Sequence, residues 1–389
     1  MRAKWPRMQR KRGHMGRALQ GQATGPWDSW EWLVAVTMAV LVALGFARRV
    51  HAQDAGALEP LMFDGMLVSA ADCPSASCPP DCCRVPHVLD PLGVDPLWSG
   101  RAEALLLWRQ SPQGLVLFEN AAGATALDAG QLGSGLAAGP RLTLFRHTGD
   151  DGAIEFNYLR VQTFEAVREL PTSADGYFQT SRGIYCCPSD VPANNVSTNM
   201  SSALQSFEIN RRFPTNGGWQ WLTGFRWVEW REAIGIGTSF ADGLILDGYQ
   251  TSTFNNLYGW QAGADSILYG LGGPFRIEGL GKAGVYYNNA VQTSARTTTA
   301  TEPPSALGVS STIGQAAFVG ELGLTAVYDI YDWLSVRGGY AAFWLGGIAQ
   351  APNQLLEQKL CPGQPIAGFT DTGGSVWVQG ITLGLEARY

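Results

Sequence analysis

The cysteines of this chain are the residues best suited to redox or metal chemistry, and they form three groups. One Pro-rich stretch holds four, a second segment holds two, and one is alone. They are Cys73, Cys78, Cys82 and Cys83, then Cys186 and Cys187, then Cys361. The C-x4-C-x3-C-C spacing matches no zinc pattern, and no histidine pair accompanies it. We expect disulfides formed in an oxidising compartment, one thiol left over, and no metal or cofactor.

A glycine pattern typical of dinucleotide sites occurs once, at Gly279, Gly281 and Gly284. It lies inside a segment in which apolar and polar residues alternate, and no helix pattern follows it. The strand-to-helix turn that binds a pyrophosphate is therefore missing. We interpret these residues as strand glycines.

Alternation with a period of two runs from residue 98 to the end of the chain, and it predicts antiparallel strands. Ten segments show it: 98–109, 139–147, 153–164, 203–213, 219–231, 253–269, 274–287, 314–328, 333–345 and 375–389. In 219–231, for example, Trp221 and Phe225 share one face while Gly224 and Arg226 share the other. A soluble β-sandwich would give the same period.

The lengths of the connections distinguish these two architectures. Four of them are short turns, and they alternate with five long segments: 110–138, 165–202, 232–252, 288–313 and 346–373. Outer-membrane barrels have tight periplasmic turns and long outer loops. The sequence thus predicts an all-β transmembrane antiparallel up-and-down β-barrel of about 10 strands (12 possible), occupying 98–389 in the bacterial outer membrane.

Aromatic residues gather near the ends of these segments, as they do in the two girdles of such barrels. They are Trp98, Trp108, Tyr158, Trp219, Trp227, Tyr258, Tyr287, Tyr328, Trp333, Tyr340 and Trp344. Tyr389 closes an alternating segment and resembles the terminal aromatic by which the barrel-assembly machinery recognises its substrates. The alternative is that these rings form the core of a soluble β protein.

Charged residues in the strands lie on the face opposite the apolar one, and seven are basic and seven acidic. The basic ones are Arg101, Arg141, Arg226, Arg276, Lys282, Arg337 and Arg388, and the acidic ones are Glu103, Glu155, Glu208, Asp265, Glu278, Glu321 and Glu386. A charge facing lipid costs about 2–4 kcal/mol near the midplane, so one-sided placement favours a barrel with these residues lining its lumen. An equal number of both signs predicts salt bridges across the lumen and little conductance, since a selectivity filter needs a ring of one sign.

The composition of the N-terminal region predicts a targeting sequence followed by a linker. Basic residues precede an apolar run at 32–47, and small residues follow at 50–52, which predicts a signal peptide over 1–52. An uncleaved membrane anchor is the alternative. Residues 53–97 are rich in Pro, Asp and Cys and predict a periplasmic tether.

Composition agrees with export to a membrane. Charged residues make up 15% of the chain, while 48 glycines and 14 tryptophans are many. A hydrophobic fraction of 46% excludes a disordered chain, and a net charge of −6 argues against nucleic-acid binding.

The strand segments resemble the bacterial beta-barrel porin family seven over about 98–389. The residues that carry the resemblance are 101–109, 256–263, 318–323 and 332–340. Phe145 departs from the pattern, because a glycine is expected there. The family name implies a pore and supplies no catalytic or binding residues.

We therefore expect a porin-like protein that lets small solutes pass through a narrow, charge-balanced lumen, with outer-membrane lipid as its surroundings. The alternative is a structural or adhesive surface barrel with a closed lumen and active outer loops. An omptin-like protease is disfavoured, because His147 lies at the periplasmic end and His87 in the tether. The same placement disfavours an outer-membrane phospholipase, which needs a nucleophilic serine near a histidine. Loop carboxylates at Asp242, Asp247 or Asp371 offer no distinctive pattern, so we predict no catalytic residue and no enzyme.

Overall fold

A computed structural model describes residues 97–389, except 113, 134, 149–151, 171–177, 181–192, 216–218, 241–244, 271, 300–304, 358–359 and 361–365. The predicted signal peptide lies outside the described residues, as do the predicted tether apart from residue 97 and all seven cysteines. Among the described residues, no helix is long and apolar enough to cross a membrane.

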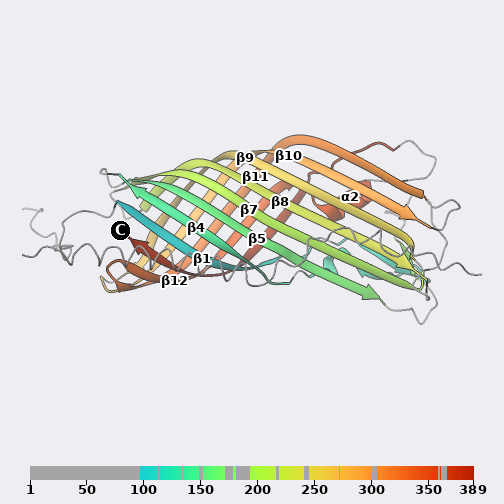
Figure 1. Cartoon of the computed structure of the whole chain (residues 1–389), viewed down its shortest axis with the longest axis horizontal. Coiled ribbons are helices and arrows are strands. Elements are labelled where there is room, and N and C mark those ends of the chain that lie inside the picture. Colours follow the sequence, from blue (N-terminus) through green and yellow to red (C-terminus); the bar gives the residue numbers. More distant parts are fainter. Residues whose placement is uncertain are drawn as a thin grey trace, which may run out of the picture.

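Strands dominate the described chain (Figure 1). They are β1 (Trp98–Arg109), β2 (Val116–Asn120), β3 (Thr125–Asp128), β4 (Ala137–His147), β5 (Ala153–Leu170), β6 (Phe178–Thr180), β7 (Asn195–Pro214), β8 (Trp219–Ser239), β9 (Ile245–Gly270), β10 (Phe275–Thr298), β11 (Ser305–Tyr331), β12 (Leu334–Ile348) and β13 (Gly374–Arg388). Ten of them close into one antiparallel barrel in the order β1-β13-β12-β11-β10-β9-β8-β7-β5-β4, and β4 pairs with β1. The predicted ten-stranded barrel is confirmed.

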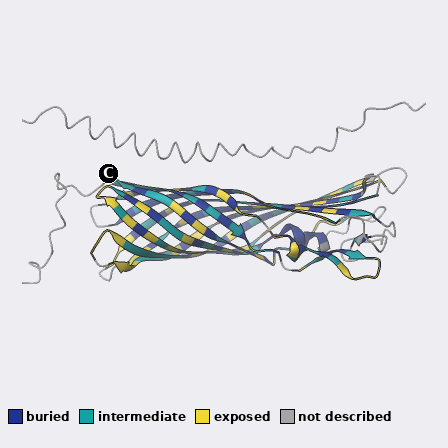
Figure 2. Ribbon diagram, turned by 90° about the horizontal axis from the view of Figure 1, so that it is seen from below, coloured by how far each residue is buried: buried dark blue, intermediate teal, exposed yellow. Residues whose placement is uncertain are grey.

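Alternation along each strand separates an outward face from an inward face (Figure 2). On β8, Trp221 and Phe225 are exposed, whereas Leu222 and Arg226, which follow them directly, are buried. Gly279 and Gly281 lie within β10, so the dinucleotide-like pattern is part of a strand, as predicted.

The tight turns and both ends of the barrel sequence lie at one end. Backbone hydrogen bonds close these turns, from Thr148 N to Gly152 O at 2.8 Å and from Thr215 N to Trp219 O at 3.1 Å. Trp98 N donates to Tyr389 O at the same end, where the C-terminus is marked in Figure 1. Because outer-membrane barrels have short periplasmic turns, we call this the periplasmic end and the opposite one the outer end.

At the outer end the strands continue farther than predicted. β8 runs to Ser239 instead of 231, β10 runs to Thr298 instead of 287, and β9 and β11 begin earlier by similar amounts. Asn195 and Asn199, which fall in the predicted connection 165–202, lie in β7. Outside the membrane the outward face of a strand no longer needs apolar side chains. The alternation of apolar and polar residues therefore becomes weaker, while the backbone pairing of the strands continues.

The connections at the outer end carry structure of their own. β2, β3 and β6 form a three-stranded sheet, next to the short 3-10 helix η2 (Ala129–Gln131), and the helix α2 (Ala351–Glu357) lies between β12 and β13. A buried apolar cluster joins them, including Phe118 of β2 and Leu355 of α2. The described part of the outer end is therefore packed around a core of its own.

Exposed apolar side chains form a belt around the barrel, bounded by aromatic rings. On β13, Ile381 and Leu383 are exposed between Trp377 and Tyr389, which are twelve positions apart. At about 3.4 Å per residue and a tilt of about 40°, this corresponds to about 30 Å along the membrane normal. Trp377 stacks on Trp344 of β12, with centroids 5.9 Å apart. A closed barrel with such a belt is an outer-membrane protein.

Candidate functional site

A layer of ion pairs crosses the lumen. Glu321 on β11 accepts hydrogen bonds from Arg141 on β4 at 2.8 Å and from Arg226 on β8 at 2.9 Å. Lys282 on β10 donates to Glu155 on β5 at 3.1 Å. Within each pair the two strands are not neighbours in the barrel, so these side chains meet by crossing its interior. The ion-pair layer comprises Glu103, Arg141, Glu155, Glu208, Arg226, Lys282 and Glu321.

Glu208 on β7 has the most partners in this layer. Its carboxylate accepts from Lys282 at 2.8 Å, from Gln261 at 2.8 Å and from Asn210 at 3.0 Å, and Arg226 Nε lies 3.4 Å away. The side chains of Glu208, Arg226 and Lys282 are 1–2% exposed. Buried charges tolerate this desolvation only when paired and hydrogen-bonded, which all three are.

β8 shows how the lumen changes toward the outer end, since its inward residues succeed one another along the barrel. After Arg226 come Val228 and Trp230, both 0% exposed, and then Glu232. Val228 and Trp230 belong to an apolar cluster that also includes Leu105, Leu107, Leu204, Phe343 and Val378. An apolar layer therefore fills the lumen directly outside the ion-pair layer.

Residues 349–357, which we call the plug segment, enter the lumen beyond the apolar layer. Asn255 on β9 donates to Ala349 O at 2.9 Å and accepts from Ala349 N at 2.8 Å. Ala351 N donates to Glu232 at 2.7 Å, and Glu232 pairs with Arg109 of β1 at 2.5 Å. Buried hydrogen bonds thus hold the plug segment to β8 and β9, and Arg109 of β1 supports the bond to β8 through Glu232.

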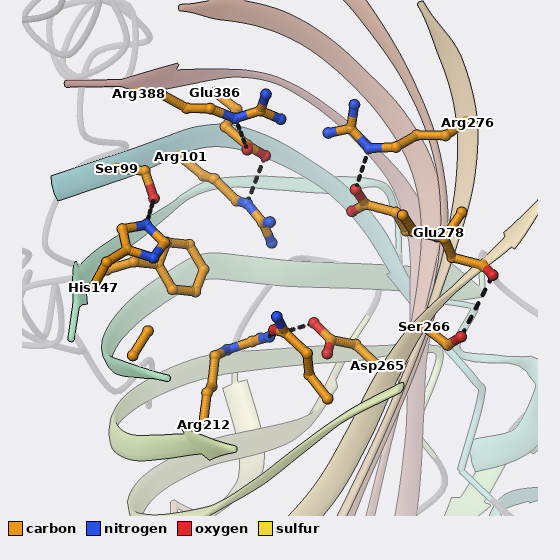
Figure 3. A pocket seen from close by; sticks show the side chains of 14 residues that line it. Ser99, Arg101, His147, Arg212, Asp265, Ser266, Arg276, Glu278, Glu386 and Arg388 are labelled. Atoms are coloured by element: carbon orange, nitrogen blue, oxygen red, sulfur yellow. Dashed lines mark hydrogen bonds and ion pairs between the residues drawn. The ribbon is translucent and has the colours of Figure 1, made fainter. Parts of the chain in front are cut away.

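A cavity of about 550 Å³ opens at the periplasmic end, and we call it the vestibule (Figure 3). The residues that line it include Ser99, Arg101, Phe145, His147, Arg212, Asp265, Arg276, Glu278, Glu386 and Arg388. A second cavity of about 60 Å³ shares some of this lining and reaches Glu321 and Lys282 of the ion-pair layer. The hollow part of the lumen thus reaches the ion-pair layer from the periplasmic side.

Phe145, which departs from the expected glycine, lies in the wall of the vestibule. The guanidinium carbon of Arg101 is 4.7 Å from the ring centroid, and that of Arg212 is 5.1 Å away. The ring is 5% exposed. An aromatic side chain between two arginines provides an apolar surface beside two charges.

All fourteen charged residues predicted for the lumen take part in ion pairs. Besides those of the ion-pair layer, Glu386 binds Arg101, Arg337 and Arg388, Arg276 binds Glu278, and Asp265 binds Arg212. Arg141 also approaches Glu103, at 4.0 Å.

Two charges among these pairs are missing from the prediction. Arg212 pairs with Glu155 and Asp265, and Asp329 pairs with Arg276 and Arg388. Arg212 follows Glu208 and Asn210 at alternate positions, so alternation alone contained the signal. Asp329 lies just beyond the predicted segment 314–328, and the extension of β11 to Tyr331 brings it to the lumen.

The apolar and plug layers of the lumen were not predicted either. Leu107 is buried between Leu106 and Trp108, which are also apolar or aromatic. Trp230 is buried between the charged residues Glu229 and Arg231, so the usual polarity of the two faces is reversed there. Interpreting every inward position as polar was wrong in the outer half of the barrel.

His147 has a serine neighbour that the sequence did not predict. Ser99 Oγ lies 2.8 Å from His147 Nε2, because β1 and β4 are paired and bring the two side chains to the vestibule. Among the described residues, no carboxylate hydrogen-bonds to His147, so the orienting member of a triad is missing. The described residues also hold no group of His, Cys, Asp or Glu arranged as a metal site. Of the loop carboxylates, Asp242 lies outside the described residues, and Asp247 pairs with Arg296 at 2.7 Å.

Comparisons with known proteins return barrels at low similarity. No protein family matches the sequence, so membership of porin family seven is not confirmed, and no curated protein matches it. Among solved structures, the outer membrane protease OmpT from Escherichia coli aligns over 75% of this chain and 96% of its own, at 10% identity and a TM-score of 0.34. The translocator domain of the autotransporter NalP from Neisseria meningitidis aligns over 75% and 88%, at 12% identity and a TM-score of 0.35. An anion-selective porin from Comamonas acidovorans aligns over 75% and 98%, at 10% identity and a TM-score of 0.18.

Proposed function

We propose that this outer-membrane barrel is a structural surface protein with a closed lumen, which acts through the packed assembly at its outer end. The observation that carries the proposal is the succession of ion-pair layer, apolar layer and plug segment. Each is buried, and among the described residues both cavities of the lumen lie on the periplasmic side of the apolar layer. A passive pore needs a continuous path for solvent.

The extension of the strands beyond the outer aromatic girdle supports the same proposal. β8 continues from Trp227 to Ser239, and β10 from Tyr287 to Thr298. Together with α2 and the β3-β2-β6 sheet, these strands form a rigid platform outside the lipid. A platform built on paired backbone presents a defined surface, as recognition on cell surfaces requires.

Conductance in planar bilayers tests the closed lumen. We expect the full chain, reconstituted in a folded state shown by circular dichroism, to give no openings of nanosiemens size. Liposomes that contain it should not swell in isosmotic arabinose or glycine, whereas liposomes with an open general porin swell. Stable large openings or rapid swelling would overturn the proposal.

Slow passage of small solutes is the second candidate, and the vestibule is the observation that favours it. The cavities that reach the ion-pair layer from the periplasm would form half of a path. Passage would then require the plug segment to move, so weakening its attachment by Asn255→Ala should accelerate glycine uptake into liposomes. An unchanged rate in this variant, with the barrel folded, favours the closed scaffold.

A further inference from the structure

The arginines of the vestibule have more donor groups than the surrounding carboxylates use. Arg101 donates from Nε to Glu386 at 2.8 Å, and no described residue accepts from its two terminal nitrogens. Arg388 also uses Nε on Glu386, at 3.2 Å, and its nearest terminal contact is Asp329 at 3.8 Å. Arg276 binds Glu278 and Asp329 through Nε and Nη1. Its Nη2 has no described acceptor.

The carboxylates of the vestibule are already engaged. Glu386 accepts from Arg101 and Arg388 and also from Arg337 at 2.6 Å. Glu278 accepts from Arg276 at 2.7 Å and from Arg337 at 2.7 Å. The donors that remain on the arginines therefore face the cavity with no described protein acceptor.

Positive and negative charges are distributed unevenly along the lumen. The described ion pairs on the periplasmic side and in the ion-pair layer contain eight cations and eight carboxylates in total. The vestibule itself is lined by four guanidinium groups and three carboxylates: Arg101, Arg212, Arg276 and Arg388 with Asp265, Glu278 and Glu386. The ion-pair layer has the opposite excess, with three cations and four carboxylates. The vestibule is thus the positive end of this arrangement.

Size, access and lining suit a small organic ion. A cavity of about 550 Å³ falls in the range of small-molecule sites. The side chains of Arg101 and Arg388 are 22% and 34% exposed, so a solute reaches them from the periplasm. Figure 3 shows the guanidinium groups of Arg101, Arg276 and Arg388 extending from three strands toward the same cavity. Phe145 supplies an apolar wall beside Arg101.

We propose that the vestibule binds a small anion with a carboxylate or phosphate group, held by Arg101 and Arg388, with any apolar part against Phe145. Guanidinium groups bind both oxyanions through paired, charge-assisted hydrogen bonds. Binding needs only access from the periplasmic end, so this inference is independent of whether the lumen conducts.

Calorimetric titration of the full chain in detergent tests this site. The probes are sodium phosphate, sodium succinate and phenyl phosphate at constant ionic strength, with tetramethylammonium chloride as a cationic control. A further arm adds short-chain phosphatidylglycerol to the micelles, which distinguishes a lipid headgroup from a free anion. The variants are Arg101→Gln and, as a matched control, Arg146→Gln, since Arg146 is on β4 at the same end but exposed and directed toward Trp98.

We expect saturable binding of at least one anion and none of the cation. Arg101→Gln should weaken that binding about tenfold or more, because a hydrogen bond to a charged group is lost, while Arg146→Gln leaves it unchanged. Phenyl phosphate should bind more tightly than phosphate. The proposal is overturned if no anion saturates, or if both arginine variants weaken binding equally, since that result indicates attraction by net charge only.

Discussion

Replacing Glu208 by glutamine removes one charge from the ion-pair layer and changes the side-chain volume little. Lys282 and Arg226 each lose a carboxylate partner, and the new amide group faces the Lys282 ammonium 2.8 Å away. Breaking a buried ion pair by removing one partner costs about 3–5 kcal/mol. Here Lys282 retains Glu155 and Arg226 retains Glu321, so we expect about 3 kcal/mol, the lower limit of that range.

Equilibrium unfolding in urea with phospholipid vesicles, followed by tryptophan fluorescence, measures this difference. Glu165→Gln is the matched control, because Glu165 is an exposed residue of β5. Substitutions at exposed positions usually change stability by less than about 0.5 kcal/mol, so the control should stay close to the parent protein. The reasoning fails if the two single variants differ by less than about 1 kcal/mol.

A double variant separates charge from packing. Glu208→Leu combined with Lys282→Leu removes one charge of each sign, and Glu155 then keeps Arg212 while Arg226 keeps Glu321. Replacing a whole buried pair by apolar residues is often neutral or stabilising. The double variant should therefore be more stable than Glu208→Gln. If it is equally destabilised, loss of shape and not loss of charge explains the single variant.

Two further predictions concern backbone contact and the plug segment. Gly224→Ala should destabilise the barrel by about 2 kcal/mol or more in the same unfolding assay, because the added Cβ would lie 2.0 Å from Ile209 O. Gly281→Ala is the control and should change the stability little, because its Cβ would lie 3.7 Å from the nearest atom. Equal effects of the two substitutions would contradict the predicted steric clash. Asn255→Ala removes both hydrogen bonds to Ala349, so hydrogen exchange of residues 349–357 should accelerate several-fold while that of β8 and β9 stays unchanged. Uniform acceleration along the barrel would indicate general loosening instead.

Much of the membrane-spanning structure could be predicted from sequence because lipid imposes a strict rule on it. Outward side chains within the bilayer must be apolar and inward ones are free to be charged, so every second residue of segments such as 219–231 reports its face. The same rule selected fourteen charged residues, and each of them has an ion-pair partner in the structure. The rule does not apply where water replaces lipid, so it missed the outer parts of the strands, which extend up to about eleven residues beyond the predicted ends.

What the chain alone determined is therefore the local character of each position: strand, face, girdle and the sign of each charge. Which charges meet depends on the closure of the barrel, since Glu321 is 180 residues from Arg141 and 95 from Arg226 and meets both across the lumen. Closure also decides that Trp230 fills the lumen, that Ser99 meets His147, and that the plug segment and vestibule lie at opposite ends. All of these contacts depend on distances between strands across the lumen, and the alternation along a single strand contains no information about such distances.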